Sequence, residues 1–171
     1  MLDSECARGT CWRGVCGDEL ELKYEDAADS DSDPAAAKWI KFDFTLTNRS
    51  STSRALGAIE VRYYFTPESV TPQFEVLSTT HLPKADSDVV GSFGITPNGW
   101  TYLSVGFLSD AGELGGGAST GVVKVGVHDA DFGPGTFYQT DDYSFLDGSH
   151  LSVHLDGQLV SGTPPTEPPS K

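Results

Sequence analysis

The sequence predicts an all-β domain in which two antiparallel sheets pack face to face. Several short segments between residues 19 and 163 alternate apolar and polar residues, as strands with one buried face do. No stretch of ten or more residues in this region places apolar residues at helical spacing. Strands do not alternate with helices either, which argues against the parallel nucleotide-binding folds.

Each predicted strand is recognised by the same period-two alternation. These strands centre on residues 20–24, 40–47, 59–65, 103–107, 123–127 and 151–155. The last of them runs into Asp156-Gly157 and then residues 158–160. Asp-Gly suits the positive φ angles of a type I′ turn, so we expect a hairpin there. The glycine run 115–117 marks a further turn.

The chain divides by composition into one domain and two tails. Its 171 residues are typical of a single domain. Residues 1–18 are small, polar and cysteine-bearing, residues 19–163 carry the strand pattern, and residues 164–171 are rich in Pro and Thr. A Pro/Thr segment of this kind is a stiff linker, typical of modules in secreted proteins. The first residues carry no secretory signal, and we interpret Met1 as the start of an excised module.

Three cysteines, Cys6, Cys11 and Cys16, lie in the N-terminal tail, and none follows. Their even spacing does not match the paired cysteines of zinc sites. We interpret them as part of a disulfide-rich linker from an extracellular chain, with three incidental thiols as the alternative. One of the three is left over within this chain.

Charge excludes two classes of partner. The chain has 11 basic and 25 acidic residues, a net charge of −14, whereas nucleic acids and anionic membranes attract clustered Lys and Arg. No apolar run approaches the roughly 18–20 residues of a membrane span. We therefore expect neither nucleic acid nor membrane as a partner.

The sequence contains no motif for catalysis. Neither His-Glu-x-x-His nor Gly-x-Ser-x-Gly occurs, and nothing places a Ser/His/Asp triad. With 25 carboxylates, chance pairs are inevitable, so a glycosidase pair cannot be assigned. We expect that the protein is not an enzyme.

The stretch 138–145 places two adjacent carboxylates, Asp141 and Asp142, between aromatic residues. Carboxylates near a core are costly without a cation, and hard oxygen ligands of this kind suit calcium. The alternative is an exposed acidic turn.

Together with residues 62–66, this stretch resembles the family 3 carbohydrate-binding modules of cellulases and cellulosomal scaffoldins. The order of further landmarks is similar to that family: 20–24, 40–48, 91–93, 101–107 and the hairpin 155–160. The resemblance covers about residues 19–163. It implies a jelly-roll sandwich of about nine strands with a structural calcium ion. The ligands that it implies are the main-chain carbonyls of Thr66 and Tyr138, and the carboxylates of Glu68, Asp141 and Asp142.

The resemblance also indicates a depleted binding face. Members that bind crystalline cellulose present a flat strip of Trp, Tyr, His, Asp and Arg on one sheet. Here residues 75–78, Glu-Val-Leu-Ser, replace a Trp-Cys-Asp-His-type segment, and the strip Arg falls at Gly126. The strip Trp becomes Phe132, following Asp131. The candidate carbohydrate contacts are Asp131, Phe132, His81 and Trp100.

Two further sets of aromatic residues have open roles. Trp39 and Trp100 either rebuild a platform or cover the rim of the core. Tyr64, Tyr102 and Tyr143 match a second, shallow groove of the family, but core packing explains them equally well.

The resemblance implies a non-catalytic, extracellular module that binds cellulose or a related β-glucan, as one part of a secreted multimodular protein. With the strip depleted, we expect weak binding to crystalline cellulose. The alternative is a calcium-stabilised structural or protein-interaction module that does not bind cellulose. The expected partners are a polysaccharide and other modules of the same chain.

Overall fold

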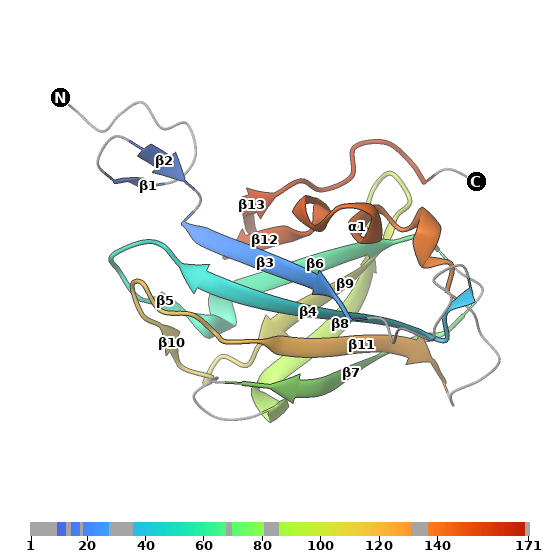
Figure 1. Cartoon of the computed structure of the whole chain (residues 1–171), viewed down its shortest axis with the longest axis horizontal. Helices are drawn as coiled ribbons and strands as arrows, with labels where there is room; N and C mark the ends of the chain where they lie inside the picture. The colour runs from blue at the N-terminus through green and yellow to red at the C-terminus, as the bar shows by residue number, and fades with distance from the viewer. Residues whose placement is uncertain are drawn as a thin grey trace.

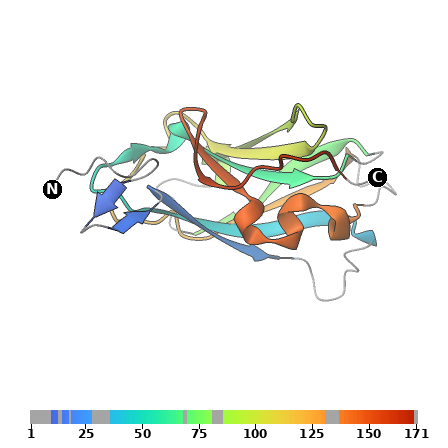
Figure 2. The same ribbon diagram turned by 90° about the horizontal axis from the view of Figure 1, so that it is seen from above.

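The computed structural model describes residues 10–12, 15–17, 19–27, 36–67, 70–80, 86–130 and 137–169. Two antiparallel sheets form a sandwich (Figures 1 and 2). The four-stranded sheet has the order β3 (Leu20–Asp26), β4 (Trp39–Asn48), β11 (Val123–Asp129) and β7 (Pro72–Thr79). The five-stranded sheet has the order β13 (Gln158–Gly162), β12 (Ser152–Leu155), β6 (Ile59–Phe65), β9 (Thr101–Phe107) and β8 (Val89–Ile95). The described part thus confirms the predicted β-sandwich of about nine strands.

Shorter elements surround the sandwich. The strands β1 (Thr10–Trp12) and β2 (Val15–Gly17) pair as a ribbon, and β5 (Arg54–Ala55) pairs with β10 (Glu113–Leu114). Cys11 lies opposite Cys16 in the first ribbon, whereas Cys6 lies outside the described residues. Helical turns occur at η2 (Leu56–Ala58), η3 (Asp86–Asp88), η5 (Gln139–Asp141), α1 (Tyr143–Leu146) and η6 (Gly148–His150). None of the helices in the described ranges is long and apolar enough to cross a membrane.

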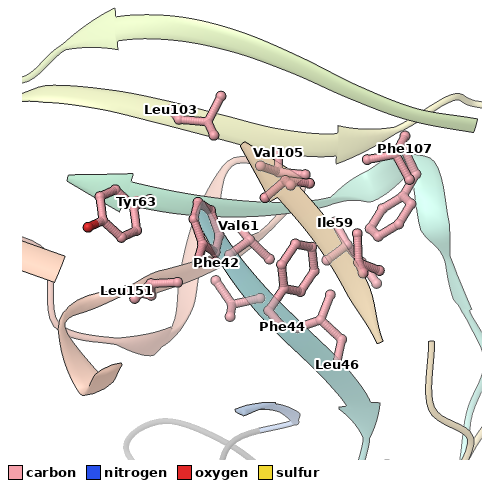
Figure 3. Packing of buried hydrophobic residues seen from close by; sticks show 14 of the residues in the cluster. Phe42, Phe44, Leu46, Ile59, Val61, Tyr63, Leu103, Val105, Phe107 and Leu151 are labelled. Carbon is pink, nitrogen blue, oxygen red and sulfur yellow. The ribbon is translucent and has the colours of Figure 1, made fainter. Parts of the chain in front are cut away.

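The core lies between the inner faces of the two sheets (Figure 3). Alternate residues of β4 and β6 point inward, which is why the period-two pattern predicted both strands. Phe42 and Tyr63 meet from opposite sheets with their rings stacked, 4.8 Å between centroids. Both side chains are fully buried. Burial of a large aromatic side chain stabilises the fold by about 1.5–3 kcal/mol.

The predicted hairpin at the end of the domain is confirmed. Asp156 has φ 50° and Gly157 has φ 76°, as a type I′ turn requires, and β12 and β13 pair on either side of them. Gly162, the last residue of β13, also has a positive φ, 80°. There the chain leaves the sheet and continues into its Pro-rich segment.

The acidic and aromatic stretch 138–145 folds as the short helical turns η5 and α1, which lie along one side of the sandwich (Figure 2). The hydroxyl of Ser144 accepts a buried hydrogen bond of 2.8 Å from the N–H of Tyr64. This bond ties α1 to β6. The turns are too short to produce a helical period, so the sequence did not predict them.

Candidate functional site

The structure brings four of the five predicted metal ligands together after the end of β6. The Thr66 N–H donates to Asp142 Oδ1 over 2.9 Å, and the Thr66 hydroxyl donates to the main-chain oxygen of Asp141 over 3.0 Å. The Asp141 N–H donates to the main-chain oxygen of Tyr138, which closes the η5 turn. The fifth residue, Glu68, lies outside the described residues.

Asp142 is the chemically informative member of this cluster. Its side chain is 1% exposed, whereas that of Asp141 is exposed to solvent. Burial, with the charge of Asp142 as a further cause, raises the pKa of Tyr63 well above its usual value. Burial and the charges of Asp26 and Asp142 raise the pKa of Tyr24 as well. The charge of Asp142 therefore acts on the hydroxyls of two neighbouring tyrosines.

Neutral oxygens lie near this carboxylate. Gln139 is 1% exposed, and its side-chain amide interacts with the Tyr63 hydroxyl. The Tyr63 hydroxyl, which also interacts with the Tyr24 hydroxyl, is buried as well. Buried polar atoms of this kind suit an oxygen-coordinated cation. No group of three His, Cys, Asp or Glu side chains in the described ranges is placed to hold a metal, so a cation there would also need main-chain or amide oxygens.

The outer face of the four-stranded sheet carries an indole laid on a glycine. Trp39 begins β4, and Gly126 lies in the neighbouring strand β11. A Cβ added at Gly126 would lie 3.0 Å from Cε3 and 3.2 Å from Cζ3 of Trp39. The missing side chain therefore lets the indole rest against the sheet. The indole held in this way is partly exposed to solvent.

Polar and charged side chains surround this indole. His128 packs beside it with 4.5 Å between ring centroids, and the Lys41 amine lies 5.5 Å from its ring. The His128 Nε2 atom is 3.7 Å from a carboxylate oxygen of Glu75 on β7. Lys124 forms an ion pair with Asp43 farther along the same face. These five residues and Trp39 make up what we call the Trp39 surface.

Of the four predicted carbohydrate contacts, the structure describes one, Trp100. His81, Asp131 and Phe132 lie outside the described residues, so their roles stay predictions. Trp100 is 6% exposed, and its indole N–H donates to the main-chain oxygen of Glu167 over 2.7 Å. In this arrangement the Trp100 ring is covered and is not part of an open surface.

Trp39 was weighed in the sequence as a possible platform but was not among the predicted contacts. The sequence contains one signal that points to it. A glycine inside a strand often marks a place where another group approaches the backbone closely, and Gly126 lies in the middle of β11. That signal indicates a close approach but does not say which side chain makes it.

The outer face of the five-stranded sheet carries a polar network. The Tyr64 hydroxyl lies 2.6 Å from Ser152 Oγ, which lies 3.0 Å from His154 Nε2. The Arg62 guanidinium lies 4.7 Å above the Tyr102 ring and bonds Glu60 at 2.7 Å. Tyr64 is thus buried and bonded, whereas Tyr102 remains partly exposed. Packing thus accounts for Tyr64, whereas the groove role stays a prediction for Tyr102 and Tyr143.

We expect stability to depend on pH through His154. Burial lowers the pKa of His154, and the nearby charge of Arg62 lowers it further. The unfolded chain binds this proton near its ordinary pKa of about 6.5. The contribution of neutral His154 is therefore present above about pH 6.5 and is lost as the pH falls below that value, by at most about 1.4 kcal/mol per pH unit.

Urea unfolding between pH 5 and pH 8 measures this effect. The expected result is a free energy of unfolding that falls below pH 6.5 in the wild type and falls less steeply in His154→Gln. Equal pH profiles for the two proteins would contradict the prediction.

A β-sandwich with an aromatic ring laid on the flat outer face of one sheet is an arrangement suited to a carbohydrate-binding module. The profile of the cellulose binding domain family matches residues 24–162. The chain belongs to this family, family 3 of the carbohydrate-binding modules.

Relatives of this chain include glucanases. Endoglucanase A of Paenibacillus lautus is 30% identical over 157 residues, 86% of this chain and 21% of that protein. An uncharacterized protein of the celA 5′ region of the same organism is 29% identical over 153 residues, 84% of this chain and 100% of its own length. The chain therefore spans about a fifth of the first relative and all of the second.

Solved structures of the family share the fold. The unique CBM3 of Hungateiclostridium clariflavum is 29% identical with a TM-score of 0.69, covering 87% of this chain and 100% of its own. A family IIIA CBD of Clostridium cellulolyticum is 26% identical with a TM-score of 0.73, covering 86% and 98%. The chain is a carbohydrate-binding module of the same family as these structures.

Proposed function

We propose that this module binds single chains of a β-glucan or related plant polysaccharide through the Trp39 surface. The observation that carries this proposal is the indole of Trp39 resting on Gly126, on the outer face of a regular sheet. Stacking of a sugar on one aromatic face is worth about 0.5–1.5 kcal/mol beyond area burial, judging from aromatic pairs. Lys41, whose amine lies 5.5 Å from the ring, and Glu75, whose carboxylate lies beside His128, are the proposed partners for the hydroxyls of a stacked sugar.

Binding to the surface of crystalline cellulose should be weak. An insoluble lattice is held by several rings stacking at once, and the described part of the Trp39 surface offers one indole. Glu75 stands where the family resemblance places a Trp, and the ion pair of Lys124 with Asp43 engages two groups that hydroxyls would otherwise contact. Losing two or three contacts lowers affinity by roughly 30- to 1000-fold, or on the order of 2–4 kcal/mol.

We propose further that the module is stabilised by calcium at the cluster of Thr66, Asp141 and Asp142. The buried carboxylate of Asp142 and the buried amide of Gln139 support this proposal. A cation there would supply charge neutralisation, and the protein would supply oxygen ligands. Carbohydrate binding and metal binding lie on different elements, so each can be tested alone.

The setting of the module is the third part of the proposal. We place it outside the cell, attached to other modules, where it concentrates a partner module on polysaccharide without catalysing a reaction. The Pro/Thr-rich segment 164–171 supports this, as does the small share that the chain makes up of Endoglucanase A.

The test of the proposed function compares soluble and crystalline glucans. Affinity electrophoresis with soluble β-glucans should retard the wild type, whereas depletion on microcrystalline cellulose should be at least tenfold weaker. Trp39→Ala should weaken soluble-glucan binding by roughly tenfold, because a full stacking contact is lost. Ile95→Ala, which removes a 74% exposed side chain from the other sheet, is the matched control.

Two results would contradict this proposal. Micromolar binding to microcrystalline cellulose would show that the aromatic strip is intact. Failure to bind any glucan, with Trp39→Ala behaving as the wild type, would favour the structural or protein-interaction module instead.

A further inference from the structure

The Pro-rich segment that follows β13 lies against the turn between β8 and β9. The side-chain amide of Asn98 donates to the main-chain oxygens of Pro165 and Glu167, over 3.0 and 2.9 Å. The indole N–H of Trp100 donates to the same Glu167 oxygen over 2.7 Å. The Pro169 ring lies next to Gly99, 3.9 Å from where a Cβ would be. Two side chains thus donate three hydrogen bonds to two carbonyls of the segment.

The turn is organised for this contact by Thr96. The Thr96 hydroxyl donates to Asn98 Oδ1 over 2.6 Å, so the carbonyl end of the amide is held inside the turn. The amide NH₂ must then face outward, and both of its hydrogens reach carbonyls of the segment. Gly99, with φ 96°, and the bond from the Thr96 N–H to the Trp100 oxygen close the turn. The donors are therefore fixed by the turn itself.

The segment is recognised through its backbone. Proline has no N–H, so a Pro-rich strand presents carbonyls in an extended, preformed helix of three residues per turn. Glu167 contributes its carbonyl, and its side chain is exposed. Pro164, Pro165 and Pro169 are partly buried, whereas Thr166 and Pro168 are exposed. Aromatic N–H donors and proline rings packed on a surface are the usual elements of polyproline recognition.

We propose that the turn Thr96–Trp100 is a docking site for a Pro-rich segment, occupied here by residues 164–169 of the same chain. The site bonds main-chain carbonyls, and the proline rings hold the segment in the conformation that presents these carbonyls. It covers Trp100, whose ring also packs against Tyr143 with 5.7 Å between centroids. This inference is independent of the proposed carbohydrate binding, which uses the other sheet.

The experiment uses the full chain with residues 164–169 replaced by Gly and Ser. A synthetic peptide, Thr-Pro-Pro-Thr-Glu-Pro-Pro, is titrated into this chain and into the wild type by calorimetry. The tethered segment competes at a local concentration in the millimolar range. The peptide should therefore bind the replaced chain at least tenfold more tightly than the wild type, and replacement should red-shift Trp fluorescence as Trp100 becomes exposed.

Point variants in the replaced chain separate docking from folding. Asn98→Asp keeps the acceptor for Thr96 but turns the amide donors into a carboxylate oxygen, and should abolish peptide binding without a large change in Tm. Trp100→Phe keeps a ring without the N–H and should weaken binding at least fivefold. A peptide in which the Glu is replaced by Ala should bind as before, because only its carbonyl is used.

Equal peptide affinity for the wild type and the replaced chain, or no binding to either, would overturn the proposal. Unchanged binding by Asn98→Asp would overturn it as well. A concentration-dependent dimer that disappears on replacing residues 164–169 would show that the occupant comes from a second copy, and would overturn the assignment within one chain.

Discussion

Replacing Asp142 by Asn is expected to lower the free energy of unfolding by about 2–4 kcal/mol in the presence of calcium. The substitution keeps an oxygen for the Thr66 N–H and removes only the charge. Asp142 is buried, and after burial its charge is the next cause that raises the pKa of Tyr63, so without a cation this buried charge would be unfavourable. The sign of the effect therefore reports whether a cation is bound.

Thermal unfolding with and without a chelator measures this prediction. The wild type should lose roughly 5–10 °C in Tm when calcium is removed, since a bound ligand stabilises the folded state by mass action. Asp142→Asn should be insensitive to the chelator, and Asp86→Ala, which removes an exposed carboxylate elsewhere, should respond as the wild type does. If Asp142→Asn is as stable as the wild type, or more stable, in both conditions, the calcium site is wrong.

Gly162→Ala is expected to be the most destabilising single-methyl change in the described part of the chain. An added Cβ would lie 1.8 Å from the main-chain oxygen of Leu151, and Gly162 also has φ 80°. Backbone atoms cannot move aside without breaking the pairing of β12 with β13. We expect a loss of more than about 3 kcal/mol in the free energy of unfolding.

Gly157→Ala is the matched control, because it carries the cost of a positive φ angle without a steric clash of the added Cβ. Gly157 has a similar φ, 76°, but an added Cβ would meet nothing within 4 Å. Its expected cost is about 1–2 kcal/mol, that of a left-handed conformation alone. Denaturant unfolding of both variants gives the comparison. Similar losses for the two would show that the contact with Leu151 relaxes freely.

Much of the fold was predictable because it depends on local patterns. Alternation in 40–47 and 59–65 identifies β4 and β6 whatever strands they pair with. Asp156-Gly157 identifies its turn for the same reason, since positive φ is a property of the residues themselves. The ribbon β5–β10, in contrast, has two residues in each strand. Strands of that length are too short to show an alternation of apolar and polar residues.

The candidate site was less predictable because it depends on pairing between distant segments. Trp39 meets Gly126 only in the register that pairs β4 with β11, and no local rule supplies that register. Trp100 looks exposed at a turn tip in the sequence, yet a residue 67 positions away covers it. The acidic pair at 141–142 was identified, but only the structure shows that Asp142 is buried and Asp141 is not.

Because Trp39 contacts Gly126, the sheet cannot carry a large side chain at both positions in this arrangement. Even a methyl group added at position 126 would lie 3.0 Å from the Trp39 ring. A long side chain there would therefore displace the ring from the sheet. Among relatives that share this register, a bulky residue at 126 should accompany a small or outward-turned residue at 39. The family resemblance places an Arg at position 126. In this chain position 126 is Gly, and the indole of Trp39 from the neighbouring strand covers it. Evolution between the two arrangements must therefore pass through a sheet that carries neither group, or through a coupled change of both.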